Sequence, residues 1–233
     1  MKSATAPARR LSHDEPASFQ PDVGIRSSDL VRRRLEEMRA QPRKAGEASF
    51  FWYETRFSRI AVKVLPGEYS VGGGDTLIAT TLGSCIAVCL WDRELRLGGL
   101  NHFMLPDGDQ GSGRYGAYAM ELLLNEMMKR GAERARLQAK IFGGARVIAG
   151  MGTLNVGERN TRFVQRYLAT EQIPVVGQDV LDTCPRKVCF FPDSGKAMVK
   201  RLGASVDTGA LWRQERDAAQ RAVSSATGSV ELF

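Results

Sequence analysis

Cys85 and His102 are the two residues of this sequence whose types could together carry out nucleophilic chemistry. A thiol is mostly protonated at neutral pH, because its ordinary pKa is about 8.5, and a neighbouring imidazole can accept that proton. Cys85 follows Gly83-Ser84, where a bent backbone could direct N–H groups toward the oxyanion that thiolate attack on a carbonyl creates. The alternative is that both residues are only packed in the core, a common fate of cysteine.

His102 is the only candidate base, because the other histidine, His13, lies in an N-terminal stretch without apolar periodicity. Two apolar runs, 85–91 and 97–104, are expected to form a β-hairpin. If residues 92–95 make its turn, Cys85 faces His102 directly, with Cβ atoms about 4.5–5.5 Å apart. A register slip of one residue would place the two side chains on opposite faces.

A catalytic imidazole usually needs a third group that orients it. Asn101 is unsuitable, because adjacent residues of a strand point to opposite faces. Thr80 and Thr81 carry hydroxyl groups in the β-branched run that precedes the cysteine, and Asp75 lies further away. The residues alone do not choose among them.

A metal site is the rival use of cysteine and histidine. Zinc knuckles commonly place two cysteines two residues apart, whereas Cys85 and Cys89 are separated by three residues, and Cys184 and Cys189 by four. We therefore expect no metal, and interpret the last three as packed thiols. Gly72-Gly73-Gly74 lacks a following Gly-Lys-Ser/Thr and is no phosphate-binding loop, so no cofactor is expected.

The elements that must position these residues follow from apolar patterning. Helices are predicted over 117–130, with Gly131 as its C-cap, and over 160–170. A short helix should begin at Ser28 and end before Pro42, and another is possible over 211–222. A Gly/Asp-rich loop spans 107–113. Strand-like segments are expected at 60–67 (a strand and its turn), 69–71, 76–82, 85–91, 97–104, 137–142, 174–182, 187–191 and 197–202.

Many strands around two central helices predict an α+β fold, a layered α/β sandwich of antiparallel strands. The 233 residues allow one ordinary domain with tails. We expect a flexible N-terminal extension with a short helix (1–49), a folded domain (50–203) and a polar C-terminal tail (204–233). The absence of an 18-residue apolar run, of a secretory signal and of a dense cysteine framework predicts a cytoplasmic protein that does not insert into membranes.

Two segments, 81–92 and 98–106, resemble the signature of the chemotaxis protein CheD family of chemoreceptor glutamine deamidases. The resemblance spans roughly residues 60–202, and the two ends of the chain lie outside it. Asp193-Ser194-Gly195 stands where many members have Thr-Gly. Further matching motifs are Tyr115, Lys129–Ala132, Lys140–Ala145, Gly157–Asn160, Arg186–Phe190 and Ser194-Gly195.

The resemblance implies a Cys-His-Thr active site with Cys85 as nucleophile and His102 as base. The resemblance places the threonine on Thr80, with Thr81 as the alternative. The position varies in the family, since some members carry the threonine one residue further from the cysteine, where this chain has Ala79. The implied reaction hydrolyses a protein glutamine carboxamide to glutamate and releases ammonia, without a cofactor.

The resemblance also implies partners. The substrate would be the cytoplasmic helical bundle of a methyl-accepting chemoreceptor, and residues 50–203 would be the deamidase domain. The family further suggests docking to a CheC-type phosphatase, and the loop 107–113 would gate access to the cysteine.

Two other functions compete with this enzyme. A non-catalytic adaptor would bind chemoreceptors or a chemotaxis phosphatase and be indifferent to Cys85→Ser. Nucleic-acid binding would draw on the net charge of +7, but no stacking motif accompanies that charge, so we expect no nucleic-acid partner.

Overall fold

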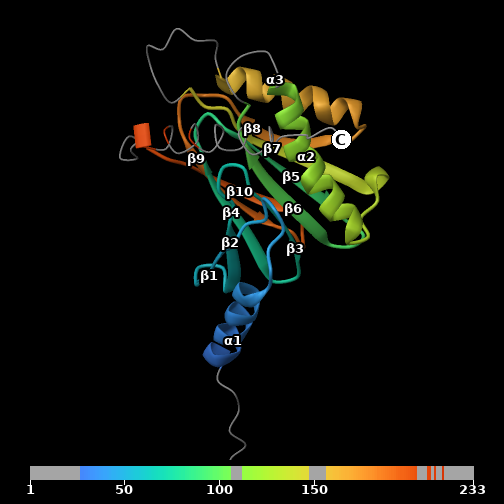
Figure 1. The fold of residues 1–233 in the computed structure, drawn as a ribbon. Coiled ribbons are helices and arrows are strands. Elements are labelled where there is room, and N and C mark those ends of the chain that lie inside the picture. The colour runs from blue at the N-terminus through green and yellow to red at the C-terminus, as the bar shows by residue number, and fades with distance from the viewer. Residues whose placement is uncertain are drawn as a thin grey trace, which may run out of the picture.

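The computed structural model describes residues 27–105, 112–146 and 156–203, with four further positions between 209 and 217. Two five-stranded sheets and three α-helices make up this part of the chain (Figure 1). The helices are α1 (Ser27–Ala40), α2 (Ser112–Lys129) and α3 (Val156–Thr170), and a 3-10 turn, η1, spans Arg134–Arg136. None of the helices in these ranges is long and apolar enough to cross a membrane.

One sheet, here called the β4 sheet, has the strand order β1-β2-β4-β9-β10, and the other, the β5 sheet, has the order β3-β6-β5-β7-β8. Most neighbouring strands are antiparallel; the β2–β4 and β7–β8 pairs are parallel. The strands are β1 (Phe50–Glu54), β2 (Arg59–Lys63), β3 (Tyr69–Gly73), β4 (Thr76–Leu82), β5 (Ile86–Asp92), β6 (Leu97–Phe103), β7 (Leu137–Gly143), β8 (Val175–Val180), β9 (Arg186–Phe191) and β10 (Lys196–Arg201).

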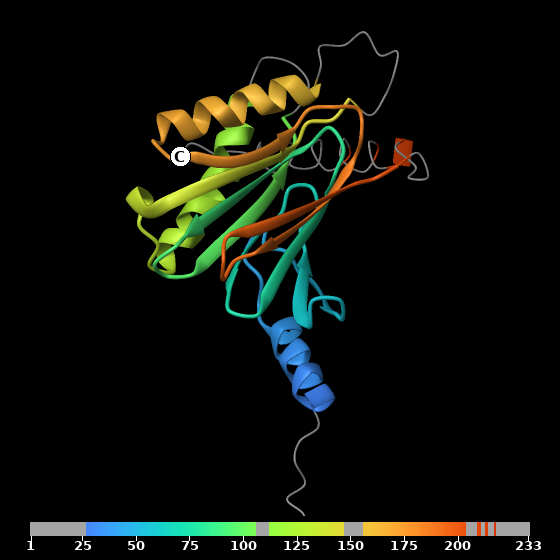
Figure 2. The ribbon, with the colours of Figure 1, turned by 180° about the vertical axis from the view of Figure 1, so that it is seen from behind.

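The molecule has three layers. Helices α2 and α3 cover one face of the β5 sheet, and the β4 sheet packs against its other face (Figures 1 and 2). Side chains alternate along β5, so Ile86 and Val88 pack under the helices while Ala87 and Cys89 pack between the sheets. This arrangement confirms the predicted α+β layered sandwich.

Several predicted boundaries differ from the structure. The two main helices begin earlier than predicted, at Ser112 and Val156, so residues 112–113 of the predicted loop are helical and its residues 107–111 lie outside the described chain. The aromatic run of β1 was not predicted as a strand. The possible helix 211–222 also lies mostly outside the described residues; positions 213 and 217 are helical.

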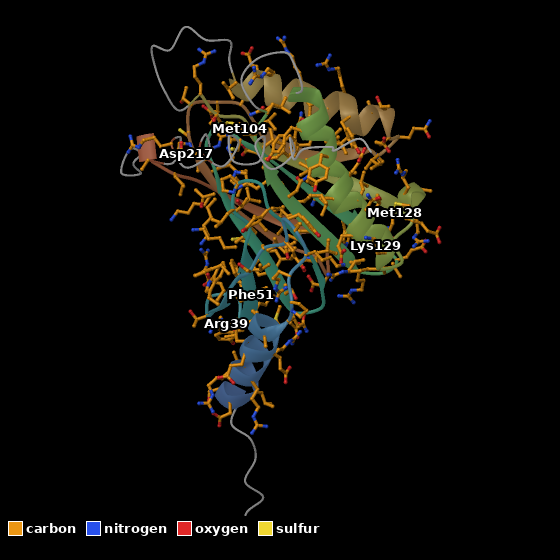
Figure 3. The ribbon with its side chains drawn as sticks, viewed as in Figure 1. Arg39, Phe51, Met104, Met128, Lys129 and Asp217 are labelled. Atoms are coloured by element: carbon orange, nitrogen blue, oxygen red, sulfur yellow. The ribbon has the colours of Figure 1, made fainter. Side chains whose placement is uncertain are left out.

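The N-terminal helix is attached to the domain. Leu35 and Met38 of α1 pack against the core between the sheets. The Arg39 guanidinium donates a hydrogen bond of 2.8 Å to the Phe51 carbonyl of β1, and Figure 3 shows these two residues together where α1 meets the sheet. Further along, Ala48 is 1% exposed. Contacts between the N-terminal segment and the domain therefore begin within α1.

Candidate active site

His102 of β6 and Thr80 of β4 meet between the two sheets. The Thr80 hydroxyl oxygen lies 2.9 Å from His102 Nδ1, and both residues are almost fully buried. The same hydroxyl donates a hydrogen bond of 2.7 Å to the Val64 carbonyl oxygen. The site is therefore shared between strands of different sheets, and its geometry depends on how the sheets pack.

The contacts of Thr80 determine which ring nitrogen of His102 carries hydrogen. A threonine hydroxyl has one hydrogen, and Thr80 directs it at Val64. Its oxygen is then an acceptor for His102 Nδ1–H. The second ring nitrogen, Nε2, consequently carries the lone pair and is the atom that can accept a proton.

Burial also sets the charge of His102. Removal of the imidazole from water lowers its pKa to about 4, although a hydrogen bond with the Val64 backbone acts in the opposite direction. The ring is therefore neutral at neutral pH and able to act as a base.

Cys85 lies on the same face of the β5 sheet as His102, but not directly opposite it. In the β5–β6 pair His102 is paired with Ala87, and Cys85 immediately precedes β5. The predicted direct pairing of Cys85 with His102 was wrong by two residues. Since side chains alternate with a period of two, a shift of two keeps both side chains in the layer between the sheets, where Cys85 and Ala87 pack.

The turn of this hairpin explains the shift. Asp92 was predicted to open the turn, but it ends β5, is fully buried and pairs with Leu97. Its carboxylate accepts hydrogen bonds from the N–H groups of Glu94 and Leu95, so the turn moves to residues 93–96.

The loop Gly83-Ser84-Cys85, which we call the nucleophile loop, is held in place by hydrogen bonds to its backbone carbonyls. The carbonyl of Gly83 accepts from Ala145 N–H at 2.8 Å, and that of Cys85 accepts from Gly144 N–H at 2.7 Å. Met104, labelled in Figure 3, contacts this loop through a 3.6 Å hydrogen bond from the Ser84 hydroxyl to its sulfur. The segments after β7 and after β6 therefore both support the loop.

Gly143 and Gly144 allow this close approach. Both have positive φ angles, +111° and +69°, and a Cβ atom on Gly143 would lie 2.1 Å from the Cys85 carbonyl oxygen. Only glycine fits there without displacement of the nucleophile loop. The two adjacent glycines at the end of a predicted strand were the sequence signal for this support, but nothing in their spacing pointed to Cys85.

Thr81 points away from the histidine, as expected for the neighbour of Thr80 on a strand. It is half-buried, and it borders a groove of about 480 Å³ on the β4 sheet that Thr80 also borders. The structure therefore brings Thr80, and not Thr81, to His102.

Cys89 is buried and Cys189 is partly buried. Burial raises the pKa of the Cys89 and Cys189 thiols, which keeps them protonated. Among the described residues, no three histidine, cysteine or acidic side chains are grouped as metal ligands.

Tyr115 of α2 is one of the residues of the matching sequence motifs. Its burial, with a smaller contribution from Cys85, raises its pKa to about 12.

Comparisons with known proteins place this chain among chemotaxis proteins. Residues 104–201 match the family model described as CheD chemotactic sensory transduction. A protein of Albidiferax ferrireducens named probable chemoreceptor glutamine deamidase CheD 1 is 59% identical over 203 residues, 86% of this chain and 87% of its own length. Proteins named probable chemoreceptor glutamine deamidase CheD from Janthinobacterium sp. and Xanthomonas campestris pv. campestris are 47% and 48% identical; the alignments cover 80% and 77% of this chain and 95% and 92% of theirs.

Proposed function

This chain belongs to the CheD family, and from that premise we propose that it is a protein-glutamine deamidase that converts glutamines of methyl-accepting chemoreceptors into glutamates. The observation that carries the proposal is the Thr80–His102 contact of 2.9 Å, which leaves Nε2 as the base nitrogen in the layer that also holds Cys85. We assign the activity to residues 50–203.

The first half of the reaction forms a thioester. His102 Nε2 takes the proton of the Cys85 thiol as the sulfur attacks the carboxamide carbon of a glutamine side chain. Because the pKa of His102 is about 4, the imidazole is neutral before the reaction and accepts the thiol proton during the attack. His102 then donates the proton to the departing nitrogen, and the C–N bond breaks with release of ammonia.

The second half hydrolyses the thioester. His102 takes a proton from water, the hydroxide oxygen attacks the thioester carbon, and the C–S bond breaks. The sulfur recovers its proton and the substrate leaves as glutamate. Throughout both halves Thr80 holds the ring through Nδ1–H, so that Nε2 faces the reacting atoms.

The experiment that tests this function is incubation of the full chain with a receptor cytoplasmic fragment that contains its methylation-site glutamines. We expect ammonia release and the mass increase that replacement of –NH2 by –OH causes, localised to specific glutamines. Cys85→Ala and His102→Ala should abolish both while the chain stays folded. Cys89→Ala, a buried cysteine in the same layer, is the matched control and should retain activity.

The adaptor function gives a different result. Tight binding to the receptor fragment without ammonia release, equal in the wild-type chain and in Cys85→Ser, would favour an adaptor and contradict the deamidase. Family membership also suggests a CheC-type phosphatase as a second partner, and its binding is measured separately, by titration with the purified phosphatase.

A further inference from the structure

We infer that Asn160 is a positioning residue that orients the peptide group between Ser84 and Cys85, so that the Cys85 N–H faces the oxygen of the reacting amide. This inference rests on the proposed function. Asn160 lies in α3, and it makes contacts with the nucleophile loop and with the segment that follows the strand bearing His102.

Both ends of the Asn160 side chain are used. Its Nδ2 donates a hydrogen bond of 2.9 Å to the Ser84 carbonyl oxygen, and its Oδ1 accepts one of 3.0 Å from the Leu105 N–H. A carbonyl can only accept and a backbone N–H can only donate, so the two partners determine the orientation of the amide. The residue has no exposed surface, and its burial is compensated by these two bonds.

The first contact fixes a peptide plane. The Ser84 carbonyl and the Cys85 N–H belong to one planar trans peptide group and point in opposite directions. Because Asn160 holds the carbonyl toward α3, the N–H is directed away from α3. A hydrogen bond to the carbonyl also polarises the peptide and makes its N–H a stronger donor.

The neighbouring peptides are fixed in the same way. The carbonyls of Gly83 and Cys85 are held by Ala145 and Gly144, so three consecutive carbonyls of the nucleophile loop have defined directions. Asn160 provides the only side chain among these three donors. Asn160 also holds the peptide group that carries the Cys85 N–H. In acyl-transfer enzymes, the backbone N–H of the nucleophile is a group that stabilises the developing oxyanion.

The second contact links this loop to the base. Leu105 follows His102 by three residues, just beyond the end of β6. One side chain therefore holds the segment before Cys85 and the segment after His102. A substitution at Asn160 should therefore mainly change the direction of the Ser84–Cys85 peptide group, and small displacements of a group that stabilises the transition state can cost on the order of 10²-fold in rate.

The test separates oxyanion stabilisation from the reactivity of the thiol. Asn160→Ala removes both contacts, whereas Asn160→Asp keeps the shape and the acceptor for Leu105 but loses the donor to Ser84. On a receptor fragment, we expect kcat to fall on the order of 10²-fold in both variants with little change in KM. Alkylation of Cys85 by iodoacetamide, followed by peptide mass mapping, involves no oxyanion at a carbonyl and should keep the wild-type rate.

A second probe does not depend on deamidase activity. The carbonyl of [1-13C]butyraldehyde adds to a cysteine thiol: a C–S bond forms and the thiol proton passes to the carbonyl oxygen, which then occupies the oxyanion position. The 13C signal of this hemithioacetal measures the affinity of the chain for the aldehyde. We expect this affinity to fall about tenfold in both Asn160 variants. If the wild-type chain forms the adduct but does not deamidate the receptor, the proposed function fails and the role of Asn160 stands.

Asn101→Ala is the matched control for loss of stability. Asn101 is also a buried asparagine with both ends hydrogen-bonded, to Val88 and Ala119, on the helix-covered face of the sheet. The Asn101→Ala substitution should lower the melting temperature while the affinity for the aldehyde stays at the wild-type value. Wild-type aldehyde affinity in both Asn160 variants, no adduct in the wild-type chain, or alkylation that falls in parallel with kcat would overturn the inference. If Asn160→Ala does not fold, Asn160→Asp decides.

Discussion

His102 is a buried imidazole whose charge and tautomer are both set by its surroundings. Burial lowers its pKa to about 4, and the Thr80 hydroxyl is placed to accept hydrogen from Nδ1. The two effects act together, because a neutral ring with hydrogen on Nδ1 has its lone pair on Nε2.

Acid should destabilise the fold through His102. The pKa of histidine is about 6.5 in an unfolded chain and about 4 here, so between these values the unfolded state binds more protons. The free energy of unfolding therefore falls as the pH falls through this window, by about 3 kcal/mol in total, and the contribution is complete above about pH 6.5. Urea denaturation at several pH values should show this loss in the wild-type chain.

The comparison that isolates His102 is His102→Gln, which should show a shallower dependence of unfolding free energy on pH in the same window. His13→Gln removes the other histidine of the chain and should leave the dependence unchanged. Equal slopes in all three proteins would show that His102 is not the group that titrates.

Thr80→Val should disturb the tautomer of His102. The substitution keeps the shape but removes the acceptor for Nδ1–H, and we expect kcat to fall on the order of 10–10²-fold. Thr80→Ser keeps the hydroxyl and should retain most activity. With only two histidines in the chain, 15N NMR in a His13→Gln background reads the His102 tautomer directly. Thr81→Val is the matched comparison, and equal losses at Thr80 and Thr81 would contradict the assignment.

The sequence was informative about the candidate site to different degrees. Cys85 and His102 could be singled out because their chemistry is rare in this chain. Thr80 and Thr81 are adjacent and chemically alike, and only the packing of the two sheets separates them. Asn160 lies 76 residues from Ser84 and 55 from Leu105, and an asparagine in a helix has no local pattern that reveals such distant partners.

At the scale of elements, the hairpin of β5 and β6 shows how local patterning succeeds and then fails. Alternation and run length predicted both strands, since these reflect burial of one face. The register failed because Asp92 resembles a turn residue, yet it is buried at the end of β5 with an ion pair of 2.9 Å to Arg136. The Asp92 carboxylate thus combines hydrogen bonds within the turn with an ion pair to a residue 44 positions away, and local patterning contains no sign of that ion pair. The missing strand β1 has a similar origin, because its buried Phe51 depends on pairing with β2.

The end of β7 provides a test at this scale. Gly143→Ala would place a Cβ atom 2.1 Å from the Cys85 carbonyl oxygen at a φ of +111°. The nucleophile loop must therefore move, and we expect loss of deamidase activity together with a lower melting temperature. Gly74→Ala is a matched control, because Gly74 also has a positive φ but no atom lies within 4 Å of the added Cβ. It should lower stability by about 1 kcal/mol through backbone strain and leave activity intact.

At the scale of the whole molecule, the site exists only while the two sheets stay in register with each other. Thr80 belongs to the β4 sheet, whereas His102 and the start of β5 belong to the β5 sheet. Arg186 joins the same two sheets: it lies in β9, has no exposed surface, and forms an ion pair with Asp179 of β8. Its guanidinium also donates to the carbonyl oxygens of Asp179 and Leu181. Arg186 thus links the β4 sheet to the β5 sheet by an ion pair and hydrogen bonds between β9 and the end of β8.

Arg186→Met should therefore weaken the contact between the sheets. The substitution removes the buried cation and its hydrogen bonds to Asp179 and Leu181, whereas Asp179 keeps its ion pair with Arg201. The loss of hydrogen bonds to a charged group costs about 1.5–3 kcal/mol. Urea denaturation of Arg186→Met, Asp179→Leu and the double variant forms a thermodynamic cycle. We expect the double variant to be less destabilised than the sum of the single variants, because the uncompensated charge is gone. Additive losses would mean that Arg186 stabilises the fold by packing alone, and that the two sheets are held together without this ion pair.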